Sequence, residues 1–316
     1  MKEYLILEEK EVSELLSISL AIETIEKCFY EKAAGTFLAL PKVNIAGKNG
    51  DLRITPGESQ KVFNTIGFRL YDVIRSDFSE QPQVIITYNN ESGKLNGIVI
   101  SQLLGAYRTA AINAVIQKYA HTKPVERMGI VGTGYQAWIH TLMLNHTLRP
   151  KKILIYGRTK SNLDAFVQRL NKELNGAVEI EACGSIEELR NVNALLLATR
   201  SKEGLLDEQV FDKKMVITTI GLKAKGCSEV SNRFAESCDL ILTDAIEQVH
   251  KYGNQFFVED LSKVIDFSEM IVDGIVNRQN FEDKKILICS VGMGGTEVAL
   301  ANELIRLKKR QILKKK

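Results

Sequence analysis

The sequence predicts an α/β fold centred on a Rossmann-type, doubly wound parallel sheet, with a region of α+β structure before it. Three observations support this prediction. Apolar strands and helical segments alternate regularly from residue 127, and a glycine motif stands at the first strand-to-helix turn of that alternation. A different pattern, of helices and short strands, fills residues 1–120. At 316 residues, the chain is long enough for two domains of medium size.

The first third of the chain is predicted to contain a helix followed by an antiparallel meander. Residues 19–34 carry apolar side chains at helical spacing. Short apolar runs, separated by turn-rich clusters, then occupy residues 42–45, 52–55, 65–71, 83–88 and 95–100. This spacing is typical of antiparallel strands. A second helix, over residues 102–120, leads to Lys123-Pro124, which we interpret as a domain boundary.

The region from residue 127 has the pattern of successive β-α units. Its candidate strands are near-continuous apolar runs, as expected when helices cover both faces of a parallel sheet. They occupy residues 128–131, 152–156, 178–182, 194–198, 215–220 and 240–243. A last strand is predicted at residues 285–289, and a helix over residues 296–313 closes the chain. We interpret the basic end of that helix as a solvated terminus favoured by the helix dipole.

A glycine motif, Gly132-Thr133-Gly134-Tyr135-Gln136-Ala137, follows the first of these strands and precedes a helix. This is the G-x-G-x-x-A pattern of dinucleotide-binding domains. Gly132 permits the tight turn, Gly134 lets the backbone approach a pyrophosphate, and Ala137 allows close packing of the helix on the strand. The helix N-terminus offers free N–H groups and a positive dipole to the phosphates. We therefore predict a nicotinamide-dinucleotide site that includes Gly132, Thr133, Gly134, Gln136 and Ala137.

The end of the second strand indicates which nucleotide is preferred. Sites specific for NAD(H) usually carry Asp or Glu here, where the carboxylate binds the ribose 2′-hydroxyl. This chain has Gly157 instead, followed by Arg158, Thr159 and Lys160. A guanidinium and a hydroxyl suit a 2′-phosphate, so we expect NADP(H) to be preferred over NAD(H), with Arg158 and Thr159 as ligands. The alternative is that Arg158 stacks on the adenine or faces solvent.

Composition and charge argue against several classes of protein. The net charge of +3 is small for this length and does not indicate nucleic-acid binding. No apolar run approaches the roughly 20 residues that span a bilayer, so we expect no membrane association. The five cysteines include no Cys-x-x-Cys pair, and the four histidines show no metal-ligand spacing. We therefore expect reduced thiols, a cytoplasmic location and no metal site.

Several further stretches, taken together with the glycine motif, resemble one known family. They are Tyr107-Arg108-Thr109-Ala110-Ala111, Ala198-Thr199-Arg200-Ser201, Gly221 to Glu229, and Ser290-Val291-Gly292-Met293. On these residues the chain resembles the ornithine cyclodeaminase/μ-crystallin family over nearly its whole length. The resemblance implies a Rossmann domain inserted into an α+β domain that binds substrate and forms a homodimer. We accordingly predict a substrate-binding and dimerisation domain at residues 1–120 and 288–316, and a dinucleotide-binding domain at residues 121–287.

The resemblance also implies a small α-amino or α-imino acid as substrate. Members of the family include cyclodeaminases, alanine dehydrogenases, ketimine or cyclic-imine reductases and opine-type dehydrogenases. We therefore expect an NADP(H)-dependent oxidoreductase that acts on the C=N or CH–NH bond of such an acid. Two alternatives stay open. One is a cyclodeaminase, and the other is a nicotinamide-nucleotide-binding protein without turnover.

The family motifs locate candidate catalytic residues in this sequence. Arg108 matches the family's carboxylate-binding arginine, whose planar guanidinium suits that group. Arg69 stands where a substrate-touching lysine is usual, and Lys223 stands where cyclodeaminases carry their catalytic aspartate. The residue at 223 argues against cyclodeamination, which needs a carboxylate near the substrate amine. Lys42 and Arg53 are secondary candidates for a second cation, and the alternative for each is a solvated strand residue.

The same motifs predict contacts with the cofactor. They leave open which group delivers a proton to the substrate nitrogen. The predicted cofactor contacts within them are Thr109, Thr199, Gly221, Ser290 and Gly292. Arginine is effectively never deprotonated, so Arg69 cannot deliver a proton as a lysine could. Lys223 or water would deliver it, unless the imine is already protonated. In the last helix Glu297 stands where the family usually has an aspartate.

Overall fold

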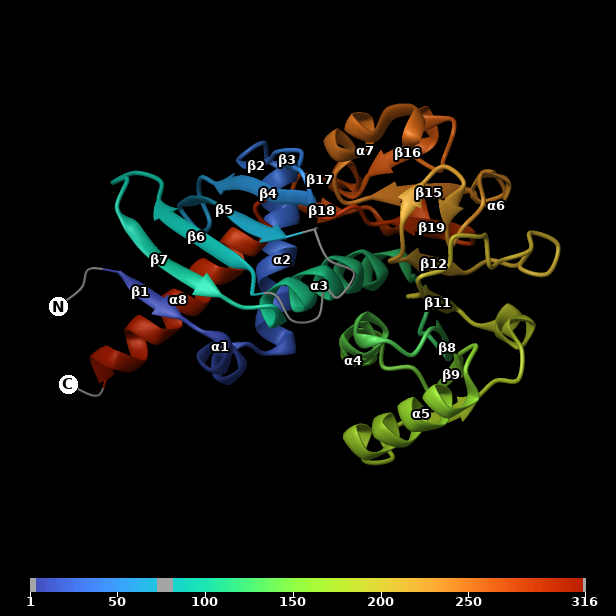
Figure 1. Ribbon diagram of the computed structural model, residues 1–316. Helices are drawn as coiled ribbons and strands as arrows, with labels where there is room; N and C mark the ends of the chain where they lie inside the picture. Colours follow the sequence, from blue (N-terminus) through green and yellow to red (C-terminus); the bar gives the residue numbers. More distant parts are fainter. Residues whose placement is uncertain (1–3, 73–81, 315–316) are drawn as a thin grey trace. The chain divides into compact units, whose positions relative to one another are not determined.

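The computed structural model describes residues 4–72 and 82–314, which fold into two compact units (Figure 1). Unit 1 comprises Met1–Ile112, Ile271–Ile275 and Gly292–Lys316, and unit 2 comprises Asn113–Met270 and Val276–Val291. These divisions differ from the boundaries predicted at residues 120 and 288. Strand β19 (Ile286–Cys289) pairs with a neighbour on each side in the sheet of unit 2, so the last segment of unit 1 begins only after it.

Unit 1 is built on a seven-stranded sheet in the order β1-β7-β6-β5-β4-β2, with β3 paired to β4. Strand β1 is parallel to β7, and the other pairings are antiparallel, as the predicted meander requires. The strands are β1 (Leu5–Leu7), β2 (Phe37–Ala39), β3 (Val43–Gly47), β4 (Gly50–Ser59), β5 (Thr65–Asp72), β6 (Val84–Asn89) and β7 (Leu95–Ile100). The helices are α1 (Glu9–Leu15), α2 (Ile18–Ala33), α3 (Leu103–Ala120, which continues into unit 2) and α8 (Thr296–Lys314). The short strand β17 (Ile271–Val272) also belongs here.

One face of this sheet forms the core of unit 1. Helix α8 packs along β4 to β7, and α2 packs against α8 and β2 (Figure 1). Because successive side chains on a strand point to opposite faces, Leu7, Ile85 and Val99 share the inner face and are fully buried there. In the same row across the sheet, Arg69 of β5 and Thr55 of β4 are also buried and pair with each other. This row therefore changes from apolar at β1, β7 and β6 to polar at β5 and β4, which is the polar end of the inner face.

The start of α3 is fixed by side chains that accept hydrogen bonds from its first turn. The Ser101 hydroxyl accepts from the Leu104 N–H at 3.2 Å. The Glu9 carboxylate accepts from the N–H groups of Gln102 and Leu103, each at 3.1 Å. A carboxylate here satisfies two otherwise free donors and complements the helix dipole. This arrangement fixes the helical position from which Arg108 projects.

Unit 2 is an eight-stranded parallel sheet in the order β10-β9-β8-β11-β12-β19-β15-β16. Its strands are β8 (Arg127–Val131), β9 (Lys152–Tyr156), β10 (Glu179–Ala182), β11 (Ala194–Leu197), β12 (Val216–Thr219), β15 (Leu240–Thr243), β16 (Val264–Asp266) and β19. The helices are α4 (Tyr135–Leu148), α5 (Lys160–Leu174), α6 (Asn232–Glu236) and α7 (Ile246–Tyr252). Two short strands, β13 (Lys223–Ala224) and β14 (Cys227–Ser228), form a separate hairpin, and β18 (Ile275–Val276) pairs with β17.

The strand order of unit 2 confirms the predicted doubly wound fold. The first five strands of the unit lie in the order three, two, one, four, five, so the direction of winding reverses between β8 and β11. Ligands of such sheets bind outside the carboxyl ends of the strands at this switch point. The glycine motif follows β8 and therefore lies at that place. Among the described residues, no helix is both long enough and apolar enough to cross a membrane.

Candidate active site

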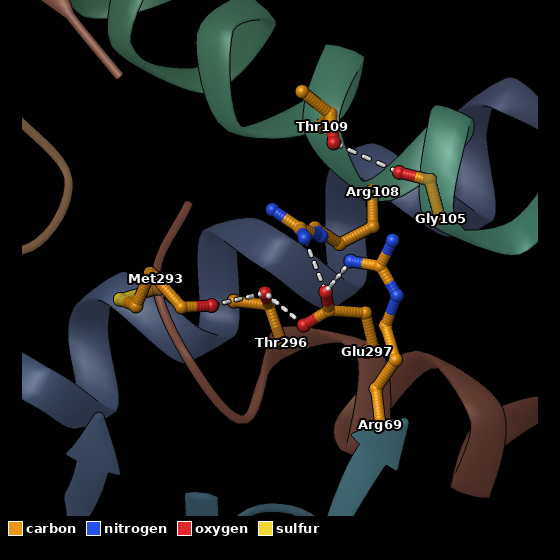
Figure 2. Close-up of polar contacts among 7 residues, drawn as sticks. All are labelled: Arg69, Gly105, Arg108, Thr109, Met293, Thr296 and Glu297. Atoms are coloured by element: carbon orange, nitrogen blue, oxygen red, sulfur yellow. Dashed lines mark hydrogen bonds and ion pairs between the residues drawn. The ribbon is translucent and has the colours of Figure 1, made fainter. Parts of the chain in front are cut away.

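A buried ion triad, formed by Arg69, Arg108 and Glu297, lies at the polar end of unit 1 (Figure 2). Arg69 comes from β5, Arg108 from α3, and Glu297 from the first turn of α8. One oxygen, Glu297 Oε1, accepts from Arg69 Nη1 at 2.6 Å and also from Arg108 Nη2. The three residues are only 7%, 4% and 0% exposed, respectively. Three distant segments of the sequence are thus joined at a single carboxylate oxygen.

The charge of Glu297 is maintained by its neighbours. Burial raises the pKa of this carboxyl, but Arg108 and Arg69 lower it by more, so the net pKa is below the ordinary value. The Thr296 hydroxyl, which donates to the Met293 carbonyl at 2.6 Å, also lies 3.3 Å from the second oxygen, Oε2. The carboxylate also lies in the first turn of α8, where the helix dipole favours negative charge. Glu297 is therefore an ionised partner for both guanidinium groups.

Part of the donor capacity of the two arginines is unused in the triad. The Nε atoms of Arg69 and Arg108 are buried and have no hydrogen-bond partner in the structure. Buried donors without partners are costly, and such groups often mark a ligand site. Since Glu297 contributes one negative charge against two positive charges, the triad carries a net charge of +1. An anionic ligand would supply both the missing acceptors and the missing charge.

Gly292 lies beside the charged groups of both Arg108 and Lys42. A β-carbon on Gly292 would lie 2.9 Å from Arg108 Nη1 and 3.3 Å from Lys42 Nζ. Gly292 has a φ of +87°, a backbone conformation that favours glycine. The absence of a side chain therefore lets a guanidinium and an ammonium approach the backbone together. Gly292 was predicted as a cofactor contact, and the structure places it beside the cations of unit 1.

Arg53 lies on the same face of the sheet as Arg69, but with different partners. Its Nε donates to Asn44 Oδ1 at 2.9 Å. Its guanidinium lies 5.9 Å from the centre of the Tyr71 ring, and that of Arg69 lies 4.0 Å from the same centre. Tyr71 thus contacts Arg69 closely by a cation–π interaction and Arg53 more weakly. Arg53 therefore lies outside the ion triad, and its link to Arg69 is through the ring of Tyr71.

In unit 2 the glycine motif has the geometry that a dinucleotide needs. Gly132 has a φ of +119°, and a β-carbon there would collide with the carbonyl oxygen of Ala198. Gly134 precedes α4 without any side-chain cap, and a β-carbon on it would meet nothing within 4 Å. The space beside Gly134 is therefore open and no side chain caps the start of α4, while Ala137 in its first turn is fully buried. These residues fit a pyrophosphate at the helix N-terminus.

Two side chains of unit 2, one in the motif and one after β19, also leave buried polar atoms for a ligand. Gln136 Oε1 and Ser290 Oγ are buried and without a hydrogen-bond partner. Thr133 lies next to the end of β9, because a β-carbon on Gly157 would come within 2.8 Å of its methyl group. An aspartate at 157 would therefore collide with Thr133. This is a physical reason why the carboxylate typical of NAD(H) sites is absent.

The residues after Gly157 are exposed and available to a 2′-phosphate. Arg158 makes no ion pair with the described part of the chain, and its side chain is exposed. Thr159 precedes α5, but its hydroxyl does not cap the helix. Lys160 is different, because its ammonium is bound to Asp164 at 3.0 Å. Arg158 and Thr159 are thus better placed for a phosphate than Lys160.

Two predicted cofactor contacts use their polar groups within the protein. The buried carboxylate of Glu229 accepts from the Thr199 hydroxyl at 2.7 Å, the Gly221 N–H at 2.7 Å and the Thr219 hydroxyl at 2.9 Å, as well as from the Thr199 N–H. Glu229 therefore ties together the loops after β11 and β12. The N–H groups of Thr199 and Gly221 serve this tie, and only their remaining surfaces could touch a cofactor. Thr109, in unit 1, donates its hydroxyl to the Gly105 carbonyl at 2.8 Å (Figure 2).

Lys223 follows the carboxyl end of β12 in unit 2 and is partly buried. Its Nζ donates to the Gly221 carbonyl at 2.6 Å. Burial lowers the pKa of Lys223, although Cys289, Glu229 and Asp244 act in the opposite direction. A lysine with a lowered pKa at this edge of a dinucleotide-binding sheet can exchange a proton more readily than an exposed one.

Comparison with known proteins is consistent with this geometry. The profile of the ornithine cyclodeaminase/mu-crystallin family matches residues 2–308. The chain belongs to this family. One relative is the ketimine reductase mu-crystallin of Macropus fuliginosus, which is 22% identical over 70% of this chain and 67% of its own length.

Two solved structures of similar proteins share the fold of this family member. The iminosuccinate reductase of Paracoccus denitrificans, in complex with NAD+, matches with a TM-score of 0.83 and 21% identity over 98% of each chain. An archaeal alanine dehydrogenase dimer with bound NAD matches with a TM-score of 0.84 and 22% identity over 98% of each chain. At these identities the likeness establishes the fold.

Two acidic residues of the site received no firm role from sequence reasoning. Glu297 was noted only as a replacement for an aspartate, and Glu229 only as part of a motif. The signal for Glu297 was the unusual arginine at 69, because a buried second guanidinium requires a carboxylate partner. The sequence gives no spacing that connects residues 69, 108 and 297, which meet only in the folded chain.

Proposed function

We propose that this protein is an NADP(H)-dependent oxidoreductase that acts on the C=N or CH–NH bond of a small α-imino or α-amino acid. The observation that carries the proposal is the buried ion triad, which leaves two guanidinium Nε donors and a net positive charge for a carboxylate. Unit 2 adds a dinucleotide motif with the appropriate backbone geometry. The reductases and the dehydrogenase among the similar proteins support this choice.

In this proposal the residues of unit 1 bind the substrate carboxylate. Arg108 offers Nε and Nη1, and Lys42 approaches the same region beside Gly292. These two nitrogens of Arg108 lie on different edges of the guanidinium, so each can donate one charge-assisted hydrogen bond to the ligand, while Nη2 holds Glu297. Arg69 provides further positive charge and is held in place by Glu297 and Tyr71. The nicotinamide nucleotide, when bound by unit 2, supplies or accepts the hydride.

The test of this function is a panel of cyclic and linear imino acids mixed with the protein and NADPH. Loss of NADPH absorbance with at least one of them is the expected result. Release of ammonia from ornithine without net change of cofactor would instead indicate cyclodeamination, the second candidate. Lys223 argues against that candidate, because its ammonium stands where a cyclodeaminase needs a carboxylate. Nucleotide binding without turnover of any imino acid would favour a non-catalytic binding protein.

We propose Lys223 as the source of the proton for the substrate nitrogen. Replacing it by methionine is expected to abolish most reductase activity and to raise the melting temperature at neutral pH. The second effect follows because burial lowers the pKa of Lys223, so the charged form is disfavoured in the folded state. The gain should vanish above about pH 10.4, the ordinary pKa of lysine, where the residue is neutral in the unfolded chain as well.

Thermal unfolding followed by circular dichroism, at a series of pH values, checks the stability effect. Lys225→Met is the matched control, because Lys225 is 61% exposed and pairs only with the exposed Glu259 among described residues. Its melting temperature should stay unchanged. If Lys223→Met keeps wild-type kcat/KM for the imine, another group or water delivers the proton.

The preference for NADP(H) is proposed to depend on Arg158 and Thr159. Arg158→Ala is expected to weaken NADPH binding by about 1.5–3 kcal/mol, the range of a hydrogen bond to a charged group, and to leave NADH binding nearly unchanged. Titration calorimetry with both nucleotides measures the difference. Lys160→Ala is the control, since Lys160 is already bound to Asp164. Equal losses for the two nucleotides would contradict a phosphate-binding role for Arg158.

A homodimer is proposed from the outer face of the unit 1 sheet. The exposed residues of this face are apolar, whereas the water-facing side of an antiparallel sheet normally carries polar residues. They include Val43, Ile45, Leu52, Ile66 and Tyr88, which are 38–52% exposed. A second copy of this chain would cover this face, and the archaeal relative is described as a dimer.

Light scattering at micromolar concentration is expected to give the mass of two chains. Ile45→Glu should shift the mass toward one chain, because a charge within an apolar interface is costly. Ile275→Glu is the control, since Ile275 is 70% exposed and lies outside this sheet. A monomeric wild-type protein would rule the interface out.

A further inference from the structure

Gln83 lies beside the polar end of the inner sheet face in unit 1. It directly precedes β6, and its backbone carbonyl accepts from the Ser101 N–H at 2.9 Å. On β5 and β6, Arg69 pairs with Ile85 and Leu70 with Val84. Continuing this register by one residue puts Gln83 opposite Tyr71, on the same face as Arg69. The sheet therefore directs Gln83 toward the residues of the ion triad.

The carboxamide of Gln83 lies next to the guanidinium of Arg69. A β-carbon on Gly105 would be 2.5 Å from Gln83 Oε1 and 3.3 Å from Arg69 Nη2, so both atoms border the same glycine of α3. Gln83 Oε1 is nevertheless buried without a hydrogen-bond partner in the structure. An amide oxygen that is buried without a partner requires a hydrogen-bond donor, because it has lost its bonds to water. Arg69 Nη1 is already bound to Glu297, and Arg69 Nη2, although it borders the same glycine, makes no hydrogen bond to Gln83 Oε1.

The unpartnered atoms at this place are of two kinds. The Nε atoms of Arg69 and Arg108 are donors and need an acceptor, whereas Gln83 Oε1 is an acceptor and needs a donor. A carboxylate satisfies only the first kind. An α-amino or protonated α-imino acid satisfies both, since it carries a carboxylate and an N–H group on one carbon. The pattern of unpartnered atoms thus matches such a ligand on both counts.

We infer that Gln83 Oε1 accepts a hydrogen bond from the substrate nitrogen and thereby selects ligands with an N–H beside the carboxylate. This inference rests on the proposed function and adds a specificity residue to it. The partial negative charge on Gln83 Oε1 would favour a protonated nitrogen at this position beside Arg69. Ligands in which oxygen or hydrogen replaces the nitrogen group lack the donor and leave Gln83 Oε1 unsatisfied.

The experiment compares two pairs of ligands that differ in the N–H group. The pairs are L-proline with tetrahydrofuran-2-carboxylate, and L-alanine with propanoate, and their dissociation constants are measured by calorimetry in the presence of NADP+. Gln83→Met is expected to weaken binding of the amino acids about 10-fold or more, the scale of a hydrogen bond to a charged group. It should change the binding of the two other acids by less than about 3-fold. Gln83→Glu retains an acceptor and should bind the amino acids at least as tightly as the wild type.

Two further variants keep the test decisive. Gly105→Ala would push the Gln83 carboxamide away, because the added methyl group would overlap Oε1, and alanine favours the helical backbone. It should reproduce the loss for amino acids if Gln83→Met does not fold. Gln60→Met, at an exposed glutamine of the same unit, should bind all four ligands as the wild type does.

The outcomes separate this inference from the proposed function. Equal weakening of both members of each pair would show that Gln83 is structural, and would overturn the inference while reductase activity stood. A preference for the amino acids that disappears in Gln83→Met supports the inference, even if no imino acid is reduced and the reductase proposal fails. A wild-type protein that binds the members of each pair equally well, or binds none of them, would overturn it.

Discussion

Replacing Glu297 by glutamine is expected to lower the free energy of unfolding by about 3 kcal/mol. The substitution keeps the shape of the side chain but leaves two buried guanidinium groups, 7% and 4% exposed, without a counter-charge. Removal of one partner of a buried ion pair typically costs about 3–5 kcal/mol. We expect the lower end, because the carboxamide oxygen can still accept one hydrogen bond. Urea unfolding measured at neutral pH gives the difference.

The dependence on pH provides a second signature of the triad. Because Arg108 and Arg69 hold the pKa of Glu297 below its ordinary value, its ionised form stabilises the folded state above the unfolded-state pKa of about 4.3. That contribution is lost as the pH falls from there through the lower folded-state pKa. The difference between the wild type and Glu297→Gln should therefore shrink in acid.

The control is another glutamate on the same helix. Glu303 also pairs with an arginine, but its partner Arg306 is 52% exposed. Glu303→Gln should cost less than Glu297→Gln, because Glu303, although only 11% exposed, has a single arginine partner that reaches solvent. A similar cost for both glutamates would show that the triad does not hold the three segments together.

Arg69→Ala is expected to reduce kcat/KM for the imino-acid substrate at least about 100-fold, equivalent to about 2.7 kcal/mol of transition-state stabilisation. The reason is that Arg69 is buried, bound to Glu297 at 2.6 Å and stacked on Tyr71, so no shorter side chain can replace its charge and planar shape. The measurement is the rate of NADPH oxidation with the best imino acid of the panel.

Arg69→Lys separates charge from shape at this position. Lysine is the residue that the family usually has here, and it keeps the charge while losing the guanidinium plane. We expect activity between those of the wild type and Arg69→Ala. Arg306→Ala, on the exposed side of α8, is the control and should retain wild-type kcat/KM. If Arg69→Ala stays within a few-fold of the wild type, the residue is structural and the substrate site lies elsewhere.

The fold class and the dinucleotide site could be predicted from the sequence because their signals are local. Apolar runs and helical spacing repeat within short windows, and the glycine motif joins its strand, turn and helix within 22 consecutive residues, from Arg127 to Leu148. The proposed preference for NADP(H) also comes from local residues, since Gly157 and Arg158 directly follow a strand. Backbone conformation and packing of these segments are fixed by their own residue types.

The arrangement of the substrate site depended on contacts that are distant in the sequence. Arg69 and Glu297 are separated by 228 residues, and Arg108 and Glu297 by 189, yet one carboxylate oxygen joins them. The register of β5 with β6 put Gln83 beside Arg69, and α3 brought Gly105 against both. The sequence also did not indicate that the N–H groups of Thr199 and Gly221 donate to Glu229, because that carboxylate reaches them only across two loops. The sequence determined which charged side chains the chain carries, and tertiary structure alone decided which of them are buried together, because burial makes each unpaired charge costly and so forces the pairing.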